Sequence, residues 1–165
     1  MDVRLETLRT SLESVVEGIP GEHLLRKLPG KWCAAEVLEH LYLTYTGTIK
    51  GLEQVIAGGQ PLVSKASLRH RVATLIVVGL GHMPAGRKTP DVAAPKGLSE
   101  DQVRSEIGAK LVEMDGLLAQ CHARFGRRKV LDHPILGPLS APQWRKLHVV
   151  HGRHHHKQLL AMLGK

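Results

Sequence analysis

Histidines are concentrated near the C-terminus of this 165-residue sequence. Five of them, His148, His151, His154, His155 and His156, fall within nine residues. In a helix, His148, His151 and His155 would share one face, because each residue advances about 100° around the axis. Imidazoles buried without partners are costly, so another group must satisfy them. A divalent metal is the leading candidate, because residues four apart on a helix have Cβ atoms about 5–6 Å apart.

A third ligand is expected from a different part of the chain. His40 lies on the inward face of a helix predicted over residues 32–57, and facing helices of a bundle can place one ligand beside two others. The predicted metal ligands are therefore His40, His151 and His155. Three neutral imidazoles leave a coordination position open, as in catalytic zinc sites. A metal held there lowers the pKa of a bound water toward 7, or holds a thiol as thiolate.

Four further side chains lie near this predicted site. Glu36, one turn before His40, either accepts the outer ring proton of that histidine or stabilises the first turn of its helix. His148 is either a donor or substrate-polarising group behind the metal ligands, or a core histidine. Gln158 lies at the edge of the same helix face. His133 precedes a proline in a loop that could approach the site, and its role stays open.

Apolar residues at helical spacing predict the elements that position these side chains. Leu68, Val72 and Leu75 favour an inward helical face in the third predicted helix, although a strand over 72–78 is the alternative. Glycines and prolines indicate a long loop over 79–97 and an extended stretch over 133–139. The predicted helices span 3–19, 32–57, 64–80, 99–121 and 141–163.

Strand signals are otherwise nearly absent, so the predicted fold class is all-α. The expected architecture is a four-helix up-down bundle with an additional short helix and a long loop between the third and fourth helices. At 165 residues, with 42% apolar and 23% charged residues, the chain is long enough to bury a core. We expect a single domain over residues 1–165.

The composition limits the classes of partner. Only five residues are aromatic, which argues against a single-stranded nucleic-acid groove lined with stacking platforms. The net charge of +8 favours anionic partners in general, but no nucleic-acid recognition motif is visible. We therefore expect a solvated basic surface, a small-molecule substrate and no specific nucleic acid.

The cellular location is predicted from two further features. Cys33 and Cys121 do not make a disulfide framework, and no secretory signal precedes the chain. The longest apolar run, over residues 75–80, is far shorter than the roughly 20 residues of a membrane span. We expect a cytoplasmic protein without a membrane partner.

Several segments carry a family resemblance: Trp32, Glu36–Leu41, His133-Pro134, Gly137, Gln143-Trp144 and His148–His155. Together they resemble the DinB/YfiT-like superfamily of four-helix-bundle metalloproteins, from about Trp32 to Gln158. Relatives bind a divalent metal, commonly zinc or nickel, through three histidines, which by this resemblance fall on His40, His151 and His155. Cys33 departs from the Ser or Thr that relatives often place there.

The resemblance implies a metal-dependent enzyme, because some relatives are thiol-dependent S-transferases or isomerases and others are described as hydrolases. We therefore expect a hydrolase or a low-molecular-weight-thiol S-transferase that acts on a small molecule, with a homodimer possible from the family. The alternative is a non-catalytic metal-binding stress-response protein whose site is structural or vestigial. A third, weaker reading is an anion-binding module that uses the basic surface.

Overall fold

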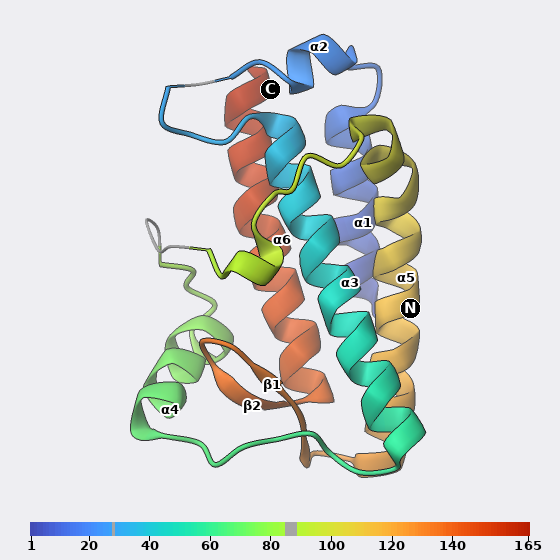
Figure 1. Cartoon of the computed structure of the whole chain (residues 1–165), viewed down its shortest axis with the longest axis vertical. Helices are drawn as coiled ribbons and strands as arrows, with labels where there is room; N and C mark the ends of the chain where they lie inside the picture. Colours follow the sequence, from blue (N-terminus) through green and yellow to red (C-terminus); the bar gives the residue numbers. More distant parts are fainter. Residues whose placement is uncertain (28, 85–88) are drawn as a thin grey trace.

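The chain is mostly helical in a computed structural model that describes residues 1–27, 29–84 and 89–165 (Figure 1). Two short strands, β1 (Lys129–His133) and β2 (Gly137–Ser140), pair as an antiparallel hairpin, so the fold is not strictly all-α. The predicted loop over 79–97 includes residues 85–88, which lie outside the described residues. The helical segments are α1 (Val3–Val16), α2 (Gly21–Leu24), α3 (Ala34–Gly58), α4 (Leu68–Thr74), the π-helical turn η1 (Leu75–Gly79), the 3-10 turn η2 (Asp91–Ala93), α5 (Glu100–Phe125) and α6 (Ala141–Leu163).

Four long helices, α1, α3, α5 and α6, lie side by side (Figure 1). Helices α1 and α6 run in the same direction, because Leu8 packs against Gly152 while Lys165 Nζ, farther along α6, donates to Val15 O at 2.9 Å. A Cβ at Gly152 would collide with the Leu8 side chain. Glycine therefore lets α1 approach the helix that carries the histidines.

Helices α3 and α5 also run in the same direction as each other. Tyr42 OH donates to Glu106 at 2.6 Å, and farther along both helices Arg124 donates to the Ile56 carbonyl at 2.9 Å. The contacts between α1 and α5 have the reverse order, because Asp2 N donates to Asp115 at 2.8 Å, whereas Arg104, earlier in α5, donates to the Val16 carbonyl at the end of α1 at 2.9 Å. The pair α3 and α5 is therefore antiparallel to the pair α1 and α6.

The long helices α3 and α5 do not follow one another directly, and the predicted up-down order of the bundle stays a prediction. Residue 59 follows the far end of α3, whereas α5 begins near the level at which α3 began; of the residues between them, 59–84 and 89–99 are described (Figure 1). α4, η1 and η2 lie in this segment, outside the set of four long helices. This crossover brings Ala93 of η2 against His40 of α3.

The ends of the histidine-bearing helices follow from local capping. Ser140 N donates to Gln143 Oε1 at 3.1 Å, which confirms the predicted start of α6. Cys33 N donates to Glu36 Oε2 at 2.8 Å, so Cys33 occupies the N-cap of α3. Reciprocal bonds of this kind satisfy amide donors that the first helical turn leaves free.

The core consists of leucine, valine and isoleucine side chains from the four long helices, as the composition indicates. Trp144 is buried, and so are the free cysteines Cys33 and Cys121. On α3, Gly51 allows a close approach of the hairpin, because a Cβ there would lie 2.6 Å from Leu131. None of the helices within the described residues is long and apolar enough to span a membrane.

The third predicted helix differs most from expectation. Residues 68–79 are helical rather than extended, but Leu68, Val72 and Leu75 face solvent, and Val77 and Val78 are the buried residues. Periodicity finds an apolar stripe but not what the stripe faces. The hairpin decides the orientation here, because Thr74 Oγ1 donates to Leu136 O at 3.0 Å.

The β-hairpin is the element that the sequence analysis missed. β1 is short and its alternation is weak, and β2 contains Pro138, which cannot donate a ladder hydrogen bond. Gly137 has φ +67°, which a side chain rarely adopts, and His70 packs where its Cβ would lie. Tertiary packing therefore determines these strands more than local propensity does.

Candidate metal centre

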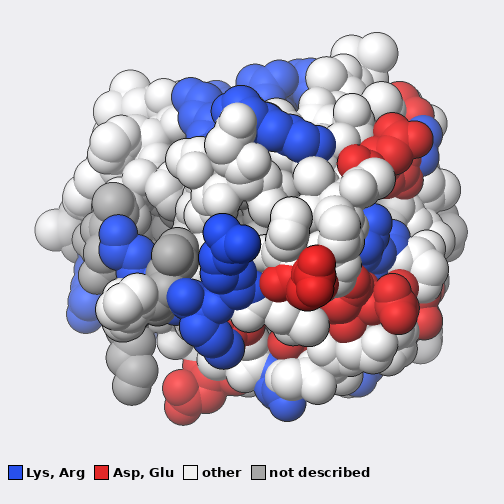
Figure 2. Space-filling model, turned by 90° about the horizontal axis from the view of Figure 1, so that it is seen from above, with Lys and Arg blue, Asp and Glu red and all other residues white. Residues whose placement is uncertain are grey.

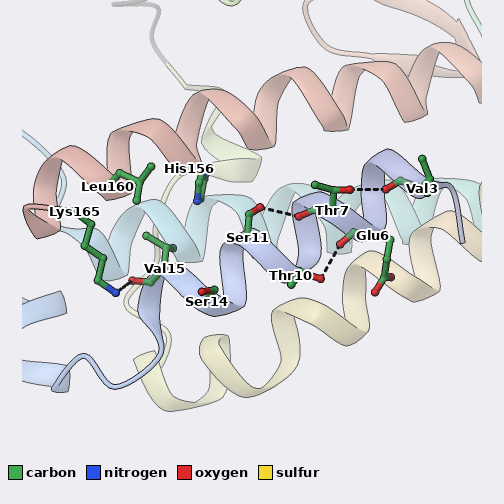
Figure 3. Close-up of a pocket in the computed structure, with 10 residues that line it drawn as sticks. All are labelled: Val3, Glu6, Thr7, Thr10, Ser11, Ser14, Val15, His156, Leu160 and Lys165. Atoms are coloured by element: carbon green, nitrogen blue, oxygen red, sulfur yellow. Dashed lines mark hydrogen bonds between the residues drawn. The ribbon is translucent and has the colours of Figure 1, made fainter.

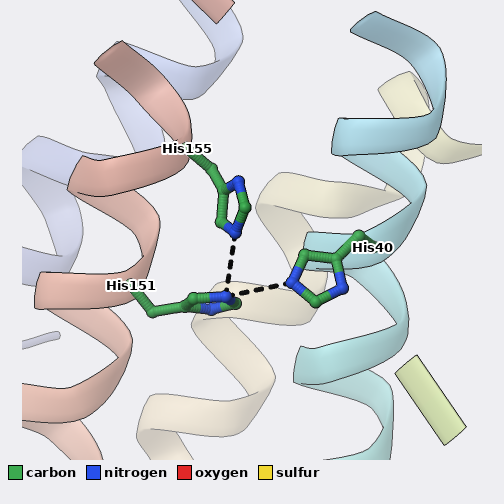
Figure 4. Close-up of side chains that lie close together, drawn as sticks. All are labelled: His40, His151 and His155. Atoms are coloured by element: carbon green, nitrogen blue, oxygen red, sulfur yellow. Dashed lines mark hydrogen bonds between the residues drawn. The ribbon is translucent and has the colours of Figure 1, made fainter. Parts of the chain in front are cut away.

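Three histidines from two antiparallel helices converge on one point (Figure 4). The Nε2 atom of His151 lies 3.0 Å from Nε2 of His40 and 3.0 Å from Nε2 of His155. Helix α3 contributes one ring, and one turn of α6 contributes two. The predicted grouping of His40, His151 and His155 is confirmed, and we call these residues the triad.

The outer ring nitrogens fix the tautomers of two of the three imidazoles. His40 Nδ1 lies 2.8 Å from the Ala93 carbonyl, an acceptor, so Nδ1 carries the hydrogen and Nε2 presents a lone pair. His155 Nδ1 lies 3.0 Å from Gln158 Oε1, which leaves its Nε2 in the same state. His151 Nε2 has at most one hydrogen when neutral, so its two short nitrogen contacts cannot both be hydrogen bonds.

A divalent metal ion bound by the three Nε2 atoms would satisfy these lone pairs. Nitrogens at roughly 2.0–2.1 Å from a tetrahedral ion lie about 3.3 Å from one another, close to the observed spacing. The oxygen acceptors behind His40 and His155 are the partners that metal-bound imidazoles usually require. The donor set therefore fits zinc or a similar ion, held by His40, His151 and His155.

Burial keeps the three rings neutral. It lowers the pKa of His40, and it lowers the pKa of His155 to about 4 with help from the neighbouring His40. The pKa of His151 falls well below its usual value because of burial and then the charges of His155 and His40. Neutral imidazole is the form that binds metal, so at neutral pH the three rings are already in the protonation state that binds an ion.

A buried carboxylate holds the covering segment in place. Glu39 of α3 is only 3% exposed and accepts hydrogen bonds from Lys96 N at 2.6 Å and Gly97 N at 3.2 Å. These bonds anchor the segment that brings the Ala93 carbonyl to His40. The sequence analysis missed Glu39 and Ala93, because a partner more than 50 residues away leaves no local pattern.

Glu36 does not contact His40. Its carboxylate pairs with Lys27 and accepts from Cys33 N, while the Ala93 carbonyl takes the outer ring proton of His40. Of the two predicted roles, the structure therefore shows the one at the first turn of the helix. The pairing with Lys27 lowers the pKa of the Glu36 carboxyl group.

His148 lies one turn before the triad but is arranged differently. It is fully buried, and neither ring nitrogen has a hydrogen-bond partner among the described residues. Its ring stacks on Trp144 at a centroid distance of 5.5 Å and meets Tyr45 edge-on at 5.5 Å. Burial lowers the pKa of His148 to about 3. The structure gives His148 no contact with a triad nitrogen and so does not support a donor role behind the ligands.

The remaining predicted side chains are divided between the triad and the hairpin. Gln158 contacts His155, as its place at the edge of the helix face suggested. The Trp32 ring lies 5.3 Å from that of His40 and is half-buried. His133 belongs to the hairpin: its Nδ1 accepts from the amides of Ile135 and Leu136, both at 3.1 Å.

A groove of about 630 Å³ lies between α1 and α6, on a face that does not include the triad (Figure 3). Two of its hydroxyl groups donate within α1, because Thr7 donates to Val3 O at 2.8 Å and Ser11 donates to Thr7 O at 2.8 Å. Lys165 Nζ donates to Val15 O at one end. The groove is therefore a weaker candidate for a functional site than the triad.

Comparison with known proteins gives one match. Residues 20–162 match the model of a family described as a protein of unknown function, DUF1569. The match contains α2 through most of α6, and with them every residue of the triad. No curated protein and no solved structure matches the chain.

Proposed function

We propose that this chain, which belongs to the DUF1569 family, is a metal-dependent enzyme that acts on a small molecule. His40, His151 and His155 hold a divalent ion, zinc or nickel, and the reaction is hydrolysis or the transfer of a low-molecular-weight thiol. One observation carries the proposal: the Nε2 atoms of His40 and His155 each lie 3.0 Å from Nε2 of His151, while the outer nitrogens of His40 and His155 are bonded to oxygen.

The composition of the site favours catalysis over a closed structural role. Within residues 1–27, 29–84 and 89–165, the ligand group contains three histidines and no fourth His, Cys, Asp or Glu. Structural zinc sites use four protein ligands, whereas catalytic sites use three and keep a position for water or substrate. An ion in the triad would activate a bound water or thiol as the nucleophile.

The chain's own residues keep the ligands in place. The Ala93 carbonyl and the Gln158 amide oxygen orient His40 and His155 so that both Nε2 lone pairs face inward. Glu39 holds the segment that supplies Ala93. Support from a main-chain carbonyl that is itself anchored makes the ligand geometry rigid, as an active centre requires.

The proposal also concerns the type of helical bundle that carries the triad. We propose a four-helix bundle of the DinB/YfiT-like kind, made of α1, α3, α5 and α6, with ligands on facing helices. The short α4 and the segment around η2 would be additions to this bundle. A cytoplasmic location and a homodimer are the expectations that go with this assignment.

Metal analysis combined with an activity screen tests the function. Tag-free protein is analysed for its metal content, and then assayed for hydrolysis of a chromogenic ester and for thiol transfer to an electrophilic dye. Metal at one equivalent, with activity in either assay that is lost on chelation and restored by zinc or nickel, supports the enzyme. His155→Ala must abolish this activity.

The matched control is His154→Ala. His154 directly precedes His155 on α6, and its ring lies 5.0 Å from that of His155, but it is not part of the triad. This variant should keep both metal and activity. Bound metal without activity in a broad substrate panel would instead favour the non-catalytic metal-binding protein, and the absence of metal binding would remove both alternatives.

A further inference from the structure

An apolar stripe lies on the outside of the helical segment 68–79. Leu68, Val72 and Leu75 occupy positions i, i+4 and i+7, which share one face of a helix. They are 77%, 50% and 62% exposed, and Leu80, directly after η1, is 75% exposed. A run of large apolar side chains at helical spacing that faces solvent usually marks an interaction site.

The stripe cannot turn inward, because the opposite face of the segment is already packed. Val77 and Val78 are buried, and Thr74 Oγ1 donates to the Leu136 carbonyl of the hairpin. Lys146 Nζ of α6 donates to Gly79 O at 3.0 Å at the end of the segment. The segment is therefore apolar on two faces, one buried in this chain and one exposed.

Positive charge surrounds the exposed face. Residues 60–84 include Lys65, Arg69 and Arg71 and no acidic residue. All three basic side chains are exposed, and two of them flank Leu68 and Val72 on the same helix. Figure 2 shows the opposite end of the molecule, where most of the acidic side chains in view gather on one side. A partner for this stripe must therefore be apolar and anionic.

The position of the segment favours a membrane surface over a peptide as the binding partner. Helix α4 lies at the edge of the molecule, beside the hairpin and away from the four long helices (Figure 1). A projecting helix with leucines on its outer face and arginines beside them resembles interfacial helices of peripheral membrane proteins. Such helices bury their apolar face about 5–10 Å into the boundary between lipid headgroups and acyl chains. A second copy fits less well, because a two-fold contact would bring Arg69 and Arg71 of both copies together.

We propose that residues 68–80 dock this protein on an anionic lipid surface, with Leu68, Val72 and Leu75 in the interface and Lys65, Arg69 and Arg71 at the headgroups. This revises the expectation of no membrane partner, which considered only a spanning segment. Peripheral docking needs neither a span nor a lipid anchor.

Vesicle sedimentation tests the proposal. The full chain should sediment with vesicles of phosphatidylglycerol and phosphatidylcholine in equal parts, and not with phosphatidylcholine alone. Val72→Ser should weaken partition about tenfold, since burial of a valine is lost. Arg69→Gln should weaken it about fivefold, since one basic residue near the surface is lost. Raised salt should weaken binding further.

Val112→Ser is the matched control, because Val112 of α5 is also 50% exposed but lies outside the stripe. It should leave partition unchanged. Failure to bind anionic vesicles, or equal loss with Val72→Ser and Val112→Ser, would overturn the proposal. So would a dimer in solution that Val72→Ser dissociates, because the stripe would then belong to a second copy. Zinc content reports separately on the triad, so failure here leaves the metal site intact.

Discussion

The histidines of α6 lie in two environments that are one helical turn apart. His151 and His155 meet His40 across the interface with α3, and the outer nitrogen of His155 is bonded to Gln158. His148 lies on the same face but meets Tyr45 of α3 and Trp144, and both of its ring nitrogens lack a partner among the described residues. The same residue type on the same helix face is thus a candidate metal ligand in one turn and a core side chain in the next.

The residue opposite on α3 makes the difference. Position 40 provides a third imidazole, whereas position 45 provides a phenol whose hydroxyl also lacks a partner in the described chain. Burial raises the pKa of Tyr45 and lowers that of His148, so both stay neutral. Helix periodicity alone cannot separate these two environments, because it describes one helix and not its neighbour.

The largest expected difference between the two environments is in stabilisation by metal. Zinc at about 1,000 times its dissociation constant should raise the free energy of unfolding by about 4 kcal/mol. In His151→Ala this gain should vanish, whereas His148→Phe should keep it. Urea unfolding with zinc and with a chelator measures both. A gain of equal size in His151→Ala would place the ion elsewhere.

The second difference concerns acid. Folded His148 stays neutral down to about pH 3, whereas the unfolded chain protonates it below about 6.5. The unfolded state therefore binds more protons in this window, and stability falls as the pH falls, by about 1.4 kcal/mol per pH unit for one such histidine. For metal-free protein, His148→Phe should make the dependence between pH 6.5 and 3 shallower. An unchanged slope in denaturant titrations would show that His148 is not a buried neutral group.

The third test concerns the support behind the triad. Gln158→Leu removes the acceptor of the His155 outer proton and should weaken zinc affinity about 10–100-fold, as loss of such partners usually does. The number of sites should stay at one, as measured by competition with a chromogenic chelator. Gln143→Leu, at the N-cap end of the same helix, should leave the affinity unchanged. Equal loss in both variants would indicate damage to α6 rather than to the ligand.

The smallest effect is expected at Tyr45. Because its hydroxyl is buried without a partner among the described residues, Tyr45→Phe should change the free energy of unfolding by less than about 1 kcal/mol, or stabilise the protein. Zinc affinity should not change. A loss above about 2 kcal/mol in urea unfolding would show that the hydroxyl is bonded in solution.

The sequence predicted the triad because its ligands are spaced on two strongly periodic helices. His151 and His155 needed only the helical repeat, and His40 needed only the apolar face of α3. The supporting groups were harder to predict: Gln158 is local to α6 and was noticed, whereas Ala93 acts through its carbonyl, which every residue type has. Glu36 has a local role, in the cap of its own helix.

The sequence predicts the fold about as far as it predicts the site: the elements with local signals, but not the contacts between distant segments. The long helices carry their own signals, but the direction of α5 depends on the crossover over residues 59–99, which has no strong pattern. The periodic spacing of Leu68 and Val72 predicts an inward face, but both side chains face solvent, since periodicity reports amphipathicity and not the identity of the partner. Contacts between distant segments determine both features.

Titration calorimetry with zinc tests the central claim most directly. Metal-free wild-type protein should bind one zinc ion per chain, and His40→Ala, whose substitution lies on the other helix, should lose that site as completely as His155→Ala. His148→Phe should bind as the wild type does. Binding that survives in His40→Ala, or a wild type that takes up no zinc, would contradict the account.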